Sequence, residues 1–346
     1  MRKIRLGKTG LLVSELGFGG IPIQRLGEEE AVRVVQRCLD LGLTFLDTAS
    51  SYTTSEERIG KAIAGRRDGL VLATKSGARD AATCREHLEL SLQRLGVEHI
   101  DLFQFHNVST EEHYEQVMAP GGLLEVARQA QAAGRVGHIG VTSHNLDMAI
   151  KLVASGEFET LMFPFCLVTP EPLEKLIPLC RQRDVAFLGM KPLGGGLLEN
   201  VTLAIKYLRQ FPDLLPVAGV QACWEIEEIV AAMEGPAAFT EAERAEGERL
   251  RRELGARFCR GCDYCQPCPQ EIHISVVLRL RGFARRSPLE QVFGEWGQSL
   301  IARAAECAEC GECETRCPYR LPIREMLADH VAWYSEARSR YEAGGR

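Results

Sequence analysis

Long apolar runs are missing from this sequence of 346 residues, and no stretch approaches the roughly 20 apolar residues of a membrane-spanning helix. Residues 1–8 are basic, but no apolar core follows them, so we do not expect a secretory signal. Positive charge is not in excess either. The net charge of −6 argues against nucleic acid or an anionic membrane as the main partner. We therefore expect a cytoplasmic protein.

A G-x-G-x-x-G motif is also missing from the start of the first helical segment. Its absence removes the usual signal of an open, doubly wound dinucleotide-binding sheet. What is present, from residue 14 to about residue 233, is an alternation of β-rich runs and amphipathic segments. The β-rich runs span 16–20, 44–49, 70–75, 100–106, 138–143, 160–165, 186–192 and 216–220. Eight such units in about 220 residues match a closed (β/α)8 TIM barrel, and we expect this α/β fold rather than the open sheet.

The chain is long enough to hold more than one domain. We expect the barrel in residues 1–235, with a short hairpin of residues 4–13 capping its floor. Residues 236–258 are polar and rich in Glu, Arg and Ala, which predicts a connecting helix. The remaining residues, 259–346, form a small cysteine-rich domain.

The thirteen cysteines are unevenly distributed. Five are scattered among apolar residues, as expected of reduced and buried thiols: Cys38, Cys84, Cys166, Cys180 and Cys223. The other eight lie in two clusters after residue 258. Disulfide frameworks are typical of small secreted domains, and this chain is expected to be neither small nor secreted. We therefore interpret the eight clustered cysteines as metal ligands.

The two clusters have closely similar spacing, although the first is one residue short before its last cysteine. They are Cys259-x2-Cys262-x2-Cys265-x2-Cys268-Pro269 and Cys307-x2-Cys310-x2-Cys313-x3-Cys317-Pro318. In two-cluster bacterial ferredoxins, three cysteines of such a run hold one [4Fe-4S] cluster and the fourth ligates the other. We therefore pair Cys317 with the first three cysteines of the first motif, and Cys268 with those of the second. The alternative is two zinc sites, but these usually pair C-x2-C units across a longer gap.

The segment between the two motifs, residues 274–304, has apolar residues at helical spacing. The domain therefore resembles an α-helical ferredoxin type rather than the compact β-hairpin type. Four arginines form a basic run here: Arg279, Arg281, Arg285 and Arg286. This run is either a solvated face or a docking surface for an acidic redox partner protein.

Polar side chains follow three successive strands of the expected barrel. Asp47, Lys75 and His106 end the second, third and fourth β-rich runs, and Tyr52 follows the second. Barrel enzymes carry their chemistry at the C-terminal ends of the strands, so these residues are expected to meet at one mouth. A free tyrosine titrates near pH ~10, and a nearby ammonium lowers that pKa. The set therefore suits proton transfer to a carbonyl, although each residue alone is more often structural.

The motifs around these residues resemble signatures of the aldo/keto reductase family, in the family's order and over nearly the whole barrel. They are Leu16-Gly-Phe-Gly-Gly20, Asp47-Thr-Ala-x-x-Tyr52, Leu72-Ala-Thr-Lys75, Ser91-Leu-x-Arg-Leu-Gly96, Ile100-Asp-Leu-x-Gln-x-His106 and Gly134-Arg-Val-Gly-His-Ile-Gly140. The resemblance implies an oxidoreductase with Tyr52 as general acid, supported by Lys75, Asp47 and His106. It also implies a small carbonyl or alcohol substrate and NADP(H), bound extended across the barrel mouth.

Several positions that hold the nicotinamide in this family are altered here. Thr142 and Ser143 stand in the places of a Ser-Asn pair that holds the carboxamide, and Met162 stands in the place of a Gln. Met190 occupies the position of a Tyr that commonly stacks on the nicotinamide ring. The resemblance therefore predicts nicotinamide binding with different contacts.

The positions that hold the phosphates differ as well. After the eighth strand, Gln221 and Ala222 replace the Arg and Ser that grip the 2′-phosphate, and Ile229 replaces an Asn that contacts adenine. Lys191 precedes three glycines, Gly194, Gly195 and Gly196. This run is either a phosphate cradle or an ordinary glycine-rich loop. The cofactor is therefore expected to be NADP or NAD, with weak discrimination or a preference for NAD.

Three functions remain open at this point, because nicotinamide passes two electrons as a hydride and a [4Fe-4S] cluster passes one. The first is a nicotinamide-linked carbonyl reductase fused to an electron-transfer module with two clusters. The second is a ferredoxin-coupled redox enzyme that uses a flavin or another cofactor. The third is an electron-transfer protein with a non-catalytic barrel, which the intact set of four polar residues disfavours.

Overall fold

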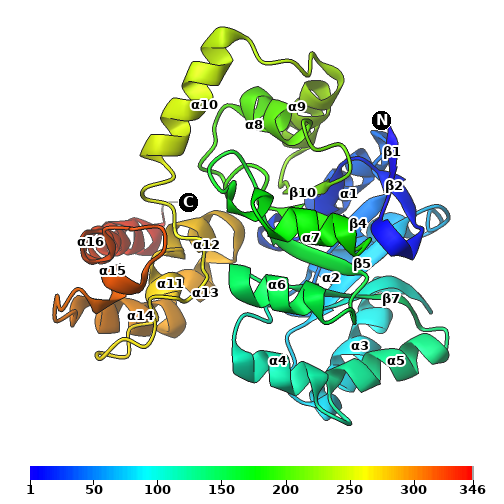
Figure 1. Ribbon diagram of the computed structural model, residues 1–346, viewed down its shortest axis with the longest axis horizontal. Coiled ribbons are helices and arrows are strands. Elements are labelled where there is room, and N and C mark those ends of the chain that lie inside the picture. The colour runs from blue at the N-terminus through cyan, green and yellow to red at the C-terminus, as the bar shows by residue number, and fades with distance from the viewer. Residues whose placement is uncertain (345–346) are drawn as a thin grey trace. The chain divides into compact units, whose positions relative to one another are not determined.

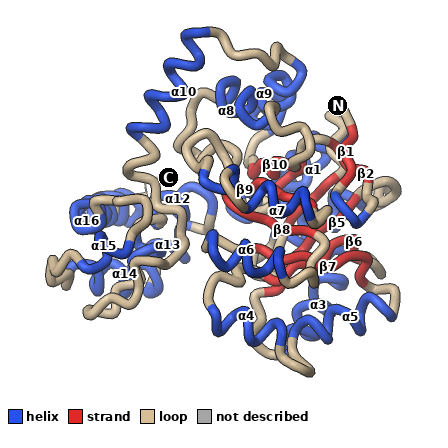
Figure 2. Tube along the Cα trace, viewed as in Figure 1, coloured by secondary structure: helices blue, strands red, loops and turns tan. Residues whose placement is uncertain are grey.

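The computed structural model describes residues 1–344 and divides into two compact units, Met1–Gly247 and the chain from Glu248 onward. Figure 1 colours the chain by residue number, and Figure 2 distinguishes the strands from the helices around them. The first unit contains all the strands of the described chain.

Eight parallel strands form a closed barrel in the order β10-β3-β4-β5-β6-β7-β8-β9. They are β3 (Gly17–Gly19), β4 (Phe45–Asp47), β5 (Val71–Ser76), β6 (Ile100–Phe105), β7 (Val136–Thr142), β8 (Thr160–Pro164), β9 (Ala186–Met190) and β10 (Leu215–Gly219). The pairing of β10 with β3, with Val217 opposite Gly17, closes the ring. The expected (β/α)8 fold class is thus confirmed.

The connecting helices cover the outside of the barrel. They are α1 (Glu28–Asp40), α2 (Ser55–Ile63), α3 (Ala81–Leu95), α4 (Glu111–Met118), α5 (Leu123–Ala132), α6 (Leu146–Ala154), α7 (Leu176–Gln182), α8 (Val201–Leu208) and α9 (Cys223–Glu234). Several of them begin at a side chain that accepts a hydrogen bond from the first-turn backbone: Asp80, Thr110, Asn145 and Asn200. These caps satisfy N–H groups that lack a partner within the helix. They also fix where each loop at the C-terminal end of a strand stops.

A hairpin of β1 (Lys3–Arg5) and β2 (Leu12–Ser14) precedes the barrel, with Ile4 opposite Val13. Ile4, Leu6 and Val13 belong to the same buried cluster as the barrel-lining Val71, Leu102, Leu188 and Leu215. The expected hairpin is therefore present, and it closes the end of the barrel at which the strands begin.

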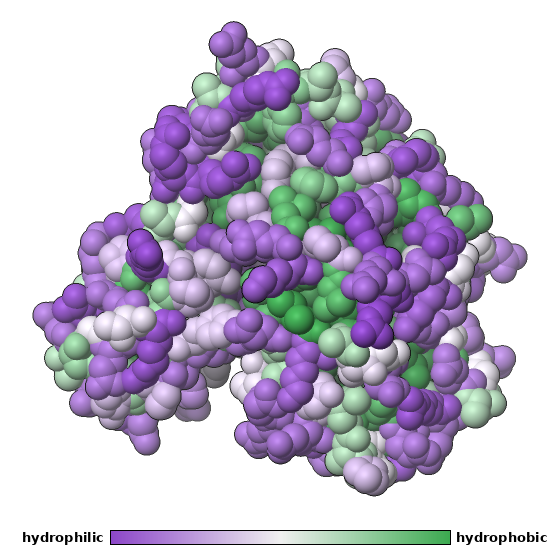
Figure 3. All heavy atoms as spheres, in the orientation of Figure 1, coloured by the Kyte–Doolittle hydropathy of each residue, from purple (hydrophilic) through white to green (hydrophobic). Residues whose placement is uncertain are grey.

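Helix α10 (Glu241–Glu253) lies within residues 236–258, where the composition predicts a connecting helix. Only Gly247 of this helix is buried, and Figure 3 shows its polar outer face. The assignment of residues 1–235, 236–258 and 259–346 to separate parts remains our proposal, because the compact units divide after Gly247.

The second unit is helical. Its helices are α11 (Ile274–Val277), α12 (Leu280–Arg286), α13 (Leu289–Phe293), α14 (Glu295–Ala305), α15 (Glu312–Arg316) and α16 (Ile323–Glu342). Their apolar side chains form one core that includes Val277, Leu280, Val292 and Leu327. Among residues 1–344, none of the helices combines the length and the apolar character needed to cross a membrane.

Candidate functional sites

A buried ion pair lies where β4 and β5 end. The ammonium of Lys75 is 2.6 Å from Oδ2 of Asp47, and it also donates a hydrogen bond of 2.6 Å to the backbone carbonyl of Thr48. The side chains of Lys75 and Asp47 are only 2% and 6% exposed. Burial alone would lower the pKa of Lys75, but the charges of Asp47 and Tyr52 outweigh it and hold that pKa above its usual value. Lys75 is therefore an ammonium at neutral pH.

A third strand supports this pair from within the barrel. The fully buried amide of Gln104, on β6, donates a hydrogen bond of 3.0 Å to Oδ1 of Asp47. Both oxygens of the carboxylate are thus engaged, and the ion pair is held in one geometry. The sequence motif Ile100-Asp-Leu-x-Gln-x-His106 contains Gln104 but gave it no role, although a polar side chain in the apolar strand Ile100–Phe105 was a usable signal.

Tyr52 and His106 lie beside the ion pair. The rings of Tyr52 and His106 meet edge to face, with centroids 5.7 Å apart and an angle of 80° between their planes. The ammonium of Lys75 is 5.1 Å from the centroid of the Tyr52 ring. Burial, and then the charges of Lys75 and Arg79, lower the pKa of His106 to about 3. The structure therefore brings together all four side chains expected at the mouth, with His106 neutral.

This arrangement has the parts for general acid–base chemistry. A phenol next to an ammonium can release a proton, because the positive charge stabilises the phenolate. A neutral imidazole can donate a hydrogen bond to an oxygen on which charge develops. The parallel strands place these groups at the barrel end where such enzymes carry their chemistry.

The side chains expected to hold a nicotinamide lie at the C-terminal ends of β7 and β9. Thr142 and Ser143 are buried, and their hydroxyls support neighbouring loops. The Thr142 hydroxyl accepts from the backbone N–H of Asn107 at 2.8 Å, and Ser143 Oγ lies 3.3 Å from Ser109 Oγ. Met190 ends β9 and is partly exposed.

The glycine-rich run after β9 has an unusual backbone. Lys191 has a positive φ of 59°, and Gly194, Gly195 and Gly196 have φ values of 60°, 69° and 93°. Consecutive left-handed residues favour glycine. The N–H groups of Gly194 and Gly196 donate to the backbone carbonyls of Lys191 and Leu193 at 2.8 and 3.0 Å, so the run folds into tight turns after β9.

The start of α9, after β10, carries a negative charge. The backbone N–H groups of Gln221 and Ala222 donate hydrogen bonds of 2.6 and 3.2 Å to one carboxylate oxygen of Glu225. These donors would otherwise suit an anion at a helix N-terminus. Sequence reasoning examined Gln221 and Ala222 but missed Glu225, which lies three and four residues further on.

Two hollows in the second unit are each lined by four cysteines. The first is lined by Cys259, Cys262, Cys265 and Cys317. The second is lined by Cys268, Cys307, Cys310 and Cys313. This is the same division of the eight cysteines that the motif spacing predicts. Within residues 1–344, no three Cys, His, Asp or Glu side chains converge on a point that could hold a single metal ion.

The loops that carry these cysteines are held by polar contacts. The guanidinium of Arg316 donates to the backbone carbonyls of Cys265 and Pro267, which belong to the other motif. The side chain of Gln266 bridges two turns, because it donates to the carbonyl of Ile272 at 2.8 Å and accepts from the N–H of Cys268 at 2.9 Å. The two motifs therefore form one structure. Each hollow receives one thiol from the other motif.

The two hollows differ in exposure. The four cysteines of the first hollow are all 8–9% exposed. In the second hollow Cys310 is exposed, and Cys268 and Cys307 are partly exposed. The scattered cysteines of the barrel follow expectation, since four are buried and Cys223 is partly buried.

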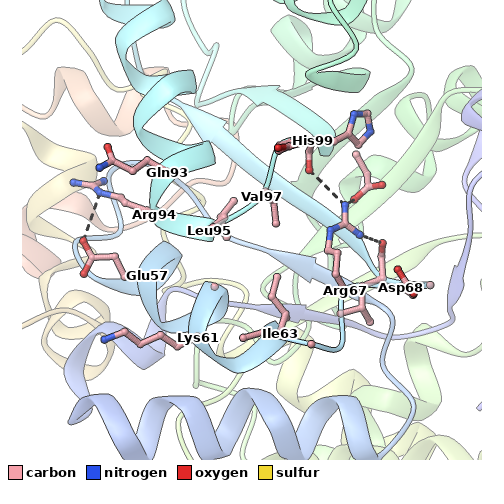
Figure 4. Close-up of a pocket in the computed structure, with 18 of the residues that line it drawn as sticks. Glu57, Lys61, Ile63, Arg67, Asp68, Gln93, Arg94, Leu95, Val97 and His99 are labelled. Atoms are coloured by element: carbon pink, nitrogen blue, oxygen red, sulfur yellow. Dashed lines mark hydrogen bonds and ion pairs between the residues drawn. The ribbon is translucent and has the colours of Figure 1, made fainter.

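A groove on the barrel unit lies elsewhere. It runs between α2 and α3 to the loops that precede β5 and β6, at the end opposite to Lys75 and Asp47. Figure 4 shows two of its arginines in contact with neighbouring groups, Arg94 with Glu57 and Arg67 with the carbonyl of His99. We therefore place the candidate active site at the other end of the barrel.

Comparison with known proteins finds two family models along the chain. The model of the aldo/keto reductase family matches residues 15–213, and the model of a 4Fe-4S dicluster domain matches residues 258–322. An uncharacterised oxidoreductase of Bacillus subtilis (strain 168) is 29% identical over 219 residues, which cover 59% of this chain and 68% of that protein. An aldo-keto reductase of Strobilurus tenacellus is 32% identical over 210 residues, which cover 55% of this chain and 61% of that protein. The chain thus spans about three fifths to two thirds of the length of these curated relatives.

Solved structures share the barrel. The holo form of an aldo-keto reductase from Bacillus halodurans has a TM-score of 0.63 and 25% identity, and it covers 72% of this chain and 96% of its own. An aldo-keto reductase from Klebsiella pneumoniae in complex with NADPH has a TM-score of 0.62 and 20% identity, and it covers 72% of this chain and 95% of its own. At that identity the second likeness shows the fold alone.

Proposed function

This chain belongs to the aldo/keto reductase family and carries a 4Fe-4S dicluster domain, and on that basis we propose that its barrel is a nicotinamide-linked carbonyl reductase. Tyr52 is the general acid, and the substrate is a small aldehyde or ketone, or in reverse an alcohol. The single observation that carries the proposal is the packing of Tyr52 between the Lys75 ammonium and the neutral His106.

Each residue of the site has a separate role in the proposed reaction. A reduced nicotinamide held by Thr142, Ser143 and Met190 would supply the hydride for the carbonyl carbon. Tyr52 gives its phenolic proton to the carbonyl oxygen, and the Lys75 ammonium stabilises the phenolate that remains. His106 donates a hydrogen bond to the same oxygen as its negative charge grows. Asp47, held by Gln104, keeps Lys75 in place.

The barrel mouth offers candidate contacts for the diphosphate and the nicotinamide of a dinucleotide, but not for a 2′-phosphate. Lys191 and the run Gly194–Gly196 are the candidates to hold a diphosphate, because the lysine adds positive charge beside the glycines. The N–H groups of Gly194 and Gly196 would have to leave the carbonyls of Lys191 and Leu193 to donate to it. Thr142, Ser143 and Met190 are the candidates to contact the nicotinamide. The carboxylate of Glu225 stands beside Gln221, where a 2′-phosphate would need positive charge. These residues favour NAD over NADP.

The cysteine unit fits two [4Fe-4S] clusters. Each hollow offers four thiols spread around a space rather than gathered at a point, as a cube of four irons requires. We assign Cys259, Cys262, Cys265 and Cys317 to one cluster, and Cys268, Cys307, Cys310 and Cys313 to the other. The unit then serves electron transfer, with a redox protein as a candidate partner.

The test is an anaerobic assay of the purified protein with a model aldehyde and either NADH or NADPH, following nucleotide absorbance and alcohol formation together. We expect one alcohol for each nucleotide oxidised. The matching dicluster domain favours a second candidate, a ferredoxin-coupled enzyme with another cofactor in the barrel. Absence of nucleotide binding, together with reduction of the aldehyde by chemically reduced protein, would favour that second candidate.

A further inference from the structure

An arginine at the barrel mouth lacks a carboxylate partner. Arg79 follows β5 by three residues, and its partly buried guanidinium donates to the backbone carbonyls of Ala78, His106 and Asn107 at 3.1, 3.2 and 3.3 Å. Throughout the described chain no carboxylate lies within ion-pairing distance, 4.0 Å, of this group. Two comparably buried arginines of the barrel, Arg67 and Arg94, are ion-paired with Asp101 and Glu56.

Further basic groups surround Arg79. His113, on α4, has a ring nitrogen, Nδ1, that is buried and accepts or donates no hydrogen bond. Burial first, and then the charge of Arg79, lowers the pKa of His113, and burial lowers the pKa of Arg79 itself. His106 experiences the charges of Lys75 and Arg79. The acidic group that acts on Arg79 and His113 is the exposed Glu112, from the first turn of α4.

A guanidinium that is partly withdrawn from water and has no carboxylate partner is stabilised by an anion. A guanidinium has five N–H donors, and the three backbone carbonyls leave donors of Arg79 available. One of these carbonyls belongs to His106, so the guanidinium lies next to the proposed reaction centre. An anion here would neutralise Arg79 and satisfy His113.

We propose that Arg79 and His113 bind a carboxylate of the substrate, so that the enzyme acts on aldehydes or ketones that carry a negative charge. This inference rests on the proposed carbonyl reduction and names its substrate class. Arg79 is then a specificity-determining residue. His106 and Tyr52 hold the carbonyl oxygen, and Arg79 holds the opposite, charged end of the molecule.

The experiment compares pairs of substrates that differ in charge but little in shape. They are 4-oxobutanoate against 4-oxobutanamide, and 4-formylbenzoate against 4-formylbenzamide. For each pair, the ratio of kcat/KM for the acid to kcat/KM for the amide is measured in the full-length protein. In Arg79→Met we expect this ratio to fall about ten- to a hundredfold, because the variant loses a hydrogen bond to a charged group. The fall should come mainly from a higher KM for the acid. Arg79→Lys should restore most of the wild-type ratio.

Arg85→Met is the matched control, since Arg85 is an exposed arginine on the next helix, α3. This variant should leave the ratio unchanged. If Arg79→Met lowers kcat/KM for acid and amide equally, Arg79 only supports the loop and the proposal is wrong. The proposal is also wrong if the wild-type protein prefers the acid over the amide no more strongly than Arg79→Met does.

A binding measurement separates this proposal from the proposed function. Calorimetric titration with benzoate and benzamide requires no turnover. We expect benzoate to bind the wild-type protein but not Arg79→Met. Benzamide should bind neither protein. If no aldehyde is reduced but benzoate binding still depends on Arg79, the proposed reduction fails and the anion site stands. If benzoate binding is independent of Arg79, the anion site fails whatever the turnover.

Discussion

At the scale of single residues, the buried ion pair of Lys75 and Asp47 is better explained by acid–base chemistry at Tyr52 than by stability. Two of the three ammonium protons of Lys75 are taken by Asp47 and the carbonyl of Thr48, and the ammonium lies 5.1 Å from the Tyr52 ring centroid. Replacing a buried ion pair by apolar side chains is often neutral for stability or even stabilising. Stability alone therefore gives little reason for this pair, whereas acid–base chemistry gives one.

Replacing Tyr52 with Phe should abolish most carbonyl reduction, because the change removes only the proton-donating hydroxyl. General acid catalysis commonly contributes ~10² to 10⁴ in rate, and we expect a loss of that order in kcat with the fold and the iron content unchanged. Tyr114→Phe is the control, because Tyr114 lies on α4 and contacts Lys151 instead. Full turnover in Tyr52→Phe, with chemistry shown to limit the rate, would remove Tyr52 from the mechanism.

His106 should make the barrel less stable in acid. Its pKa is about 3 in the folded protein and near 6.5 when the chain is unfolded. Between these values the unfolded chain binds a proton that the folded chain does not, so the free energy of unfolding falls as pH decreases from 6.5 toward 3. Above pH 6.5 His106 is neutral in both states, and the free energy of unfolding no longer depends on pH through this residue.

The measurement is urea unfolding of the wild type and His106→Gln between pH 7 and pH 4.5. The difference between the two free energies of unfolding should shrink as pH falls, by less than about 1.4 kcal/mol per pH unit. Acid effects on the cysteine unit cancel, because both proteins contain it. A difference that does not vary with pH would show that His106 titrates normally.

Some site residues could be predicted from the sequence and others could not. Asp47, Lys75 and His106 end apolar runs, which is a local signal. Gln104 and Arg79 act through partners that lie 57 and 27 residues away in sequence, and only the barrel brings such partners together. The roles of all these residues remain predictions until variants are measured.

At the scale of elements, the start of α9 should decide between the two nucleotides. Charge-assisted contacts to a phosphate are strong, yet here the carboxylate of Glu225 occupies the N–H groups of Gln221 and Ala222. We expect dissociation constants for NADH and NADPH that differ little or favour NADH, in anaerobic titrations. Glu225→Gln should strengthen NADPH binding relative to NADH, because it removes the repulsion. A preference of the wild type for NADPH of a hundredfold, about 2.7 kcal/mol, would show that another cation holds the phosphate.

The two cysteine motifs share one structure, and this makes their clusters interdependent. Cys313 is buried in the second hollow, and the neighbouring Arg316 donates to the carbonyls of Cys265 and Pro267. Cys313→Ala should therefore remove one cluster and weaken the other, seen as a loss of more than half of the iron on gel filtration. Cys223→Ala, in the barrel, is the control and should keep the full iron content. Loss of only one cluster, with the other as stable as in the wild type, would argue against the coupling.

Two helices were missed at this scale, α4 and the short α15 in the second cysteine motif. Helix α4, Glu111–Met118, buries only Val117, so its sequence has too weak an apolar stripe to predict a helix. Its start depends on the Thr110 side chain, which accepts from the N–H of His113 at 3.2 Å. The strands and most other helices could be predicted, because each buries a regular set of apolar residues.

At the scale of the whole molecule, the metal content is the most direct test. Protein purified without oxygen should contain about eight irons and about eight acid-labile sulfides per chain, as two [4Fe-4S] clusters require. Iron and sulfide are measured on the same sample, with zinc determined alongside. Zinc in place of iron, with negligible sulfide, would support two tetrahedral thiolate sites instead.

The closure of the barrel by β10 and β3 has a consequence for synthesis on the ribosome. Residues 17–19 cannot find their second neighbour until residues 215–219 have left the exit tunnel, so the nascent barrel stays open at one seam. Cys317, which completes the first set of four thiols, emerges roughly 100 residues later, and a ribosome adds about 5–20 residues per second. The barrel therefore has about 5–20 seconds to close before that set is complete. Mutations that slow closure should then expose an unpaired strand edge while unmetallated thiols are emerging, and the cost should appear as aggregation during expression rather than as a lower melting temperature of the finished protein.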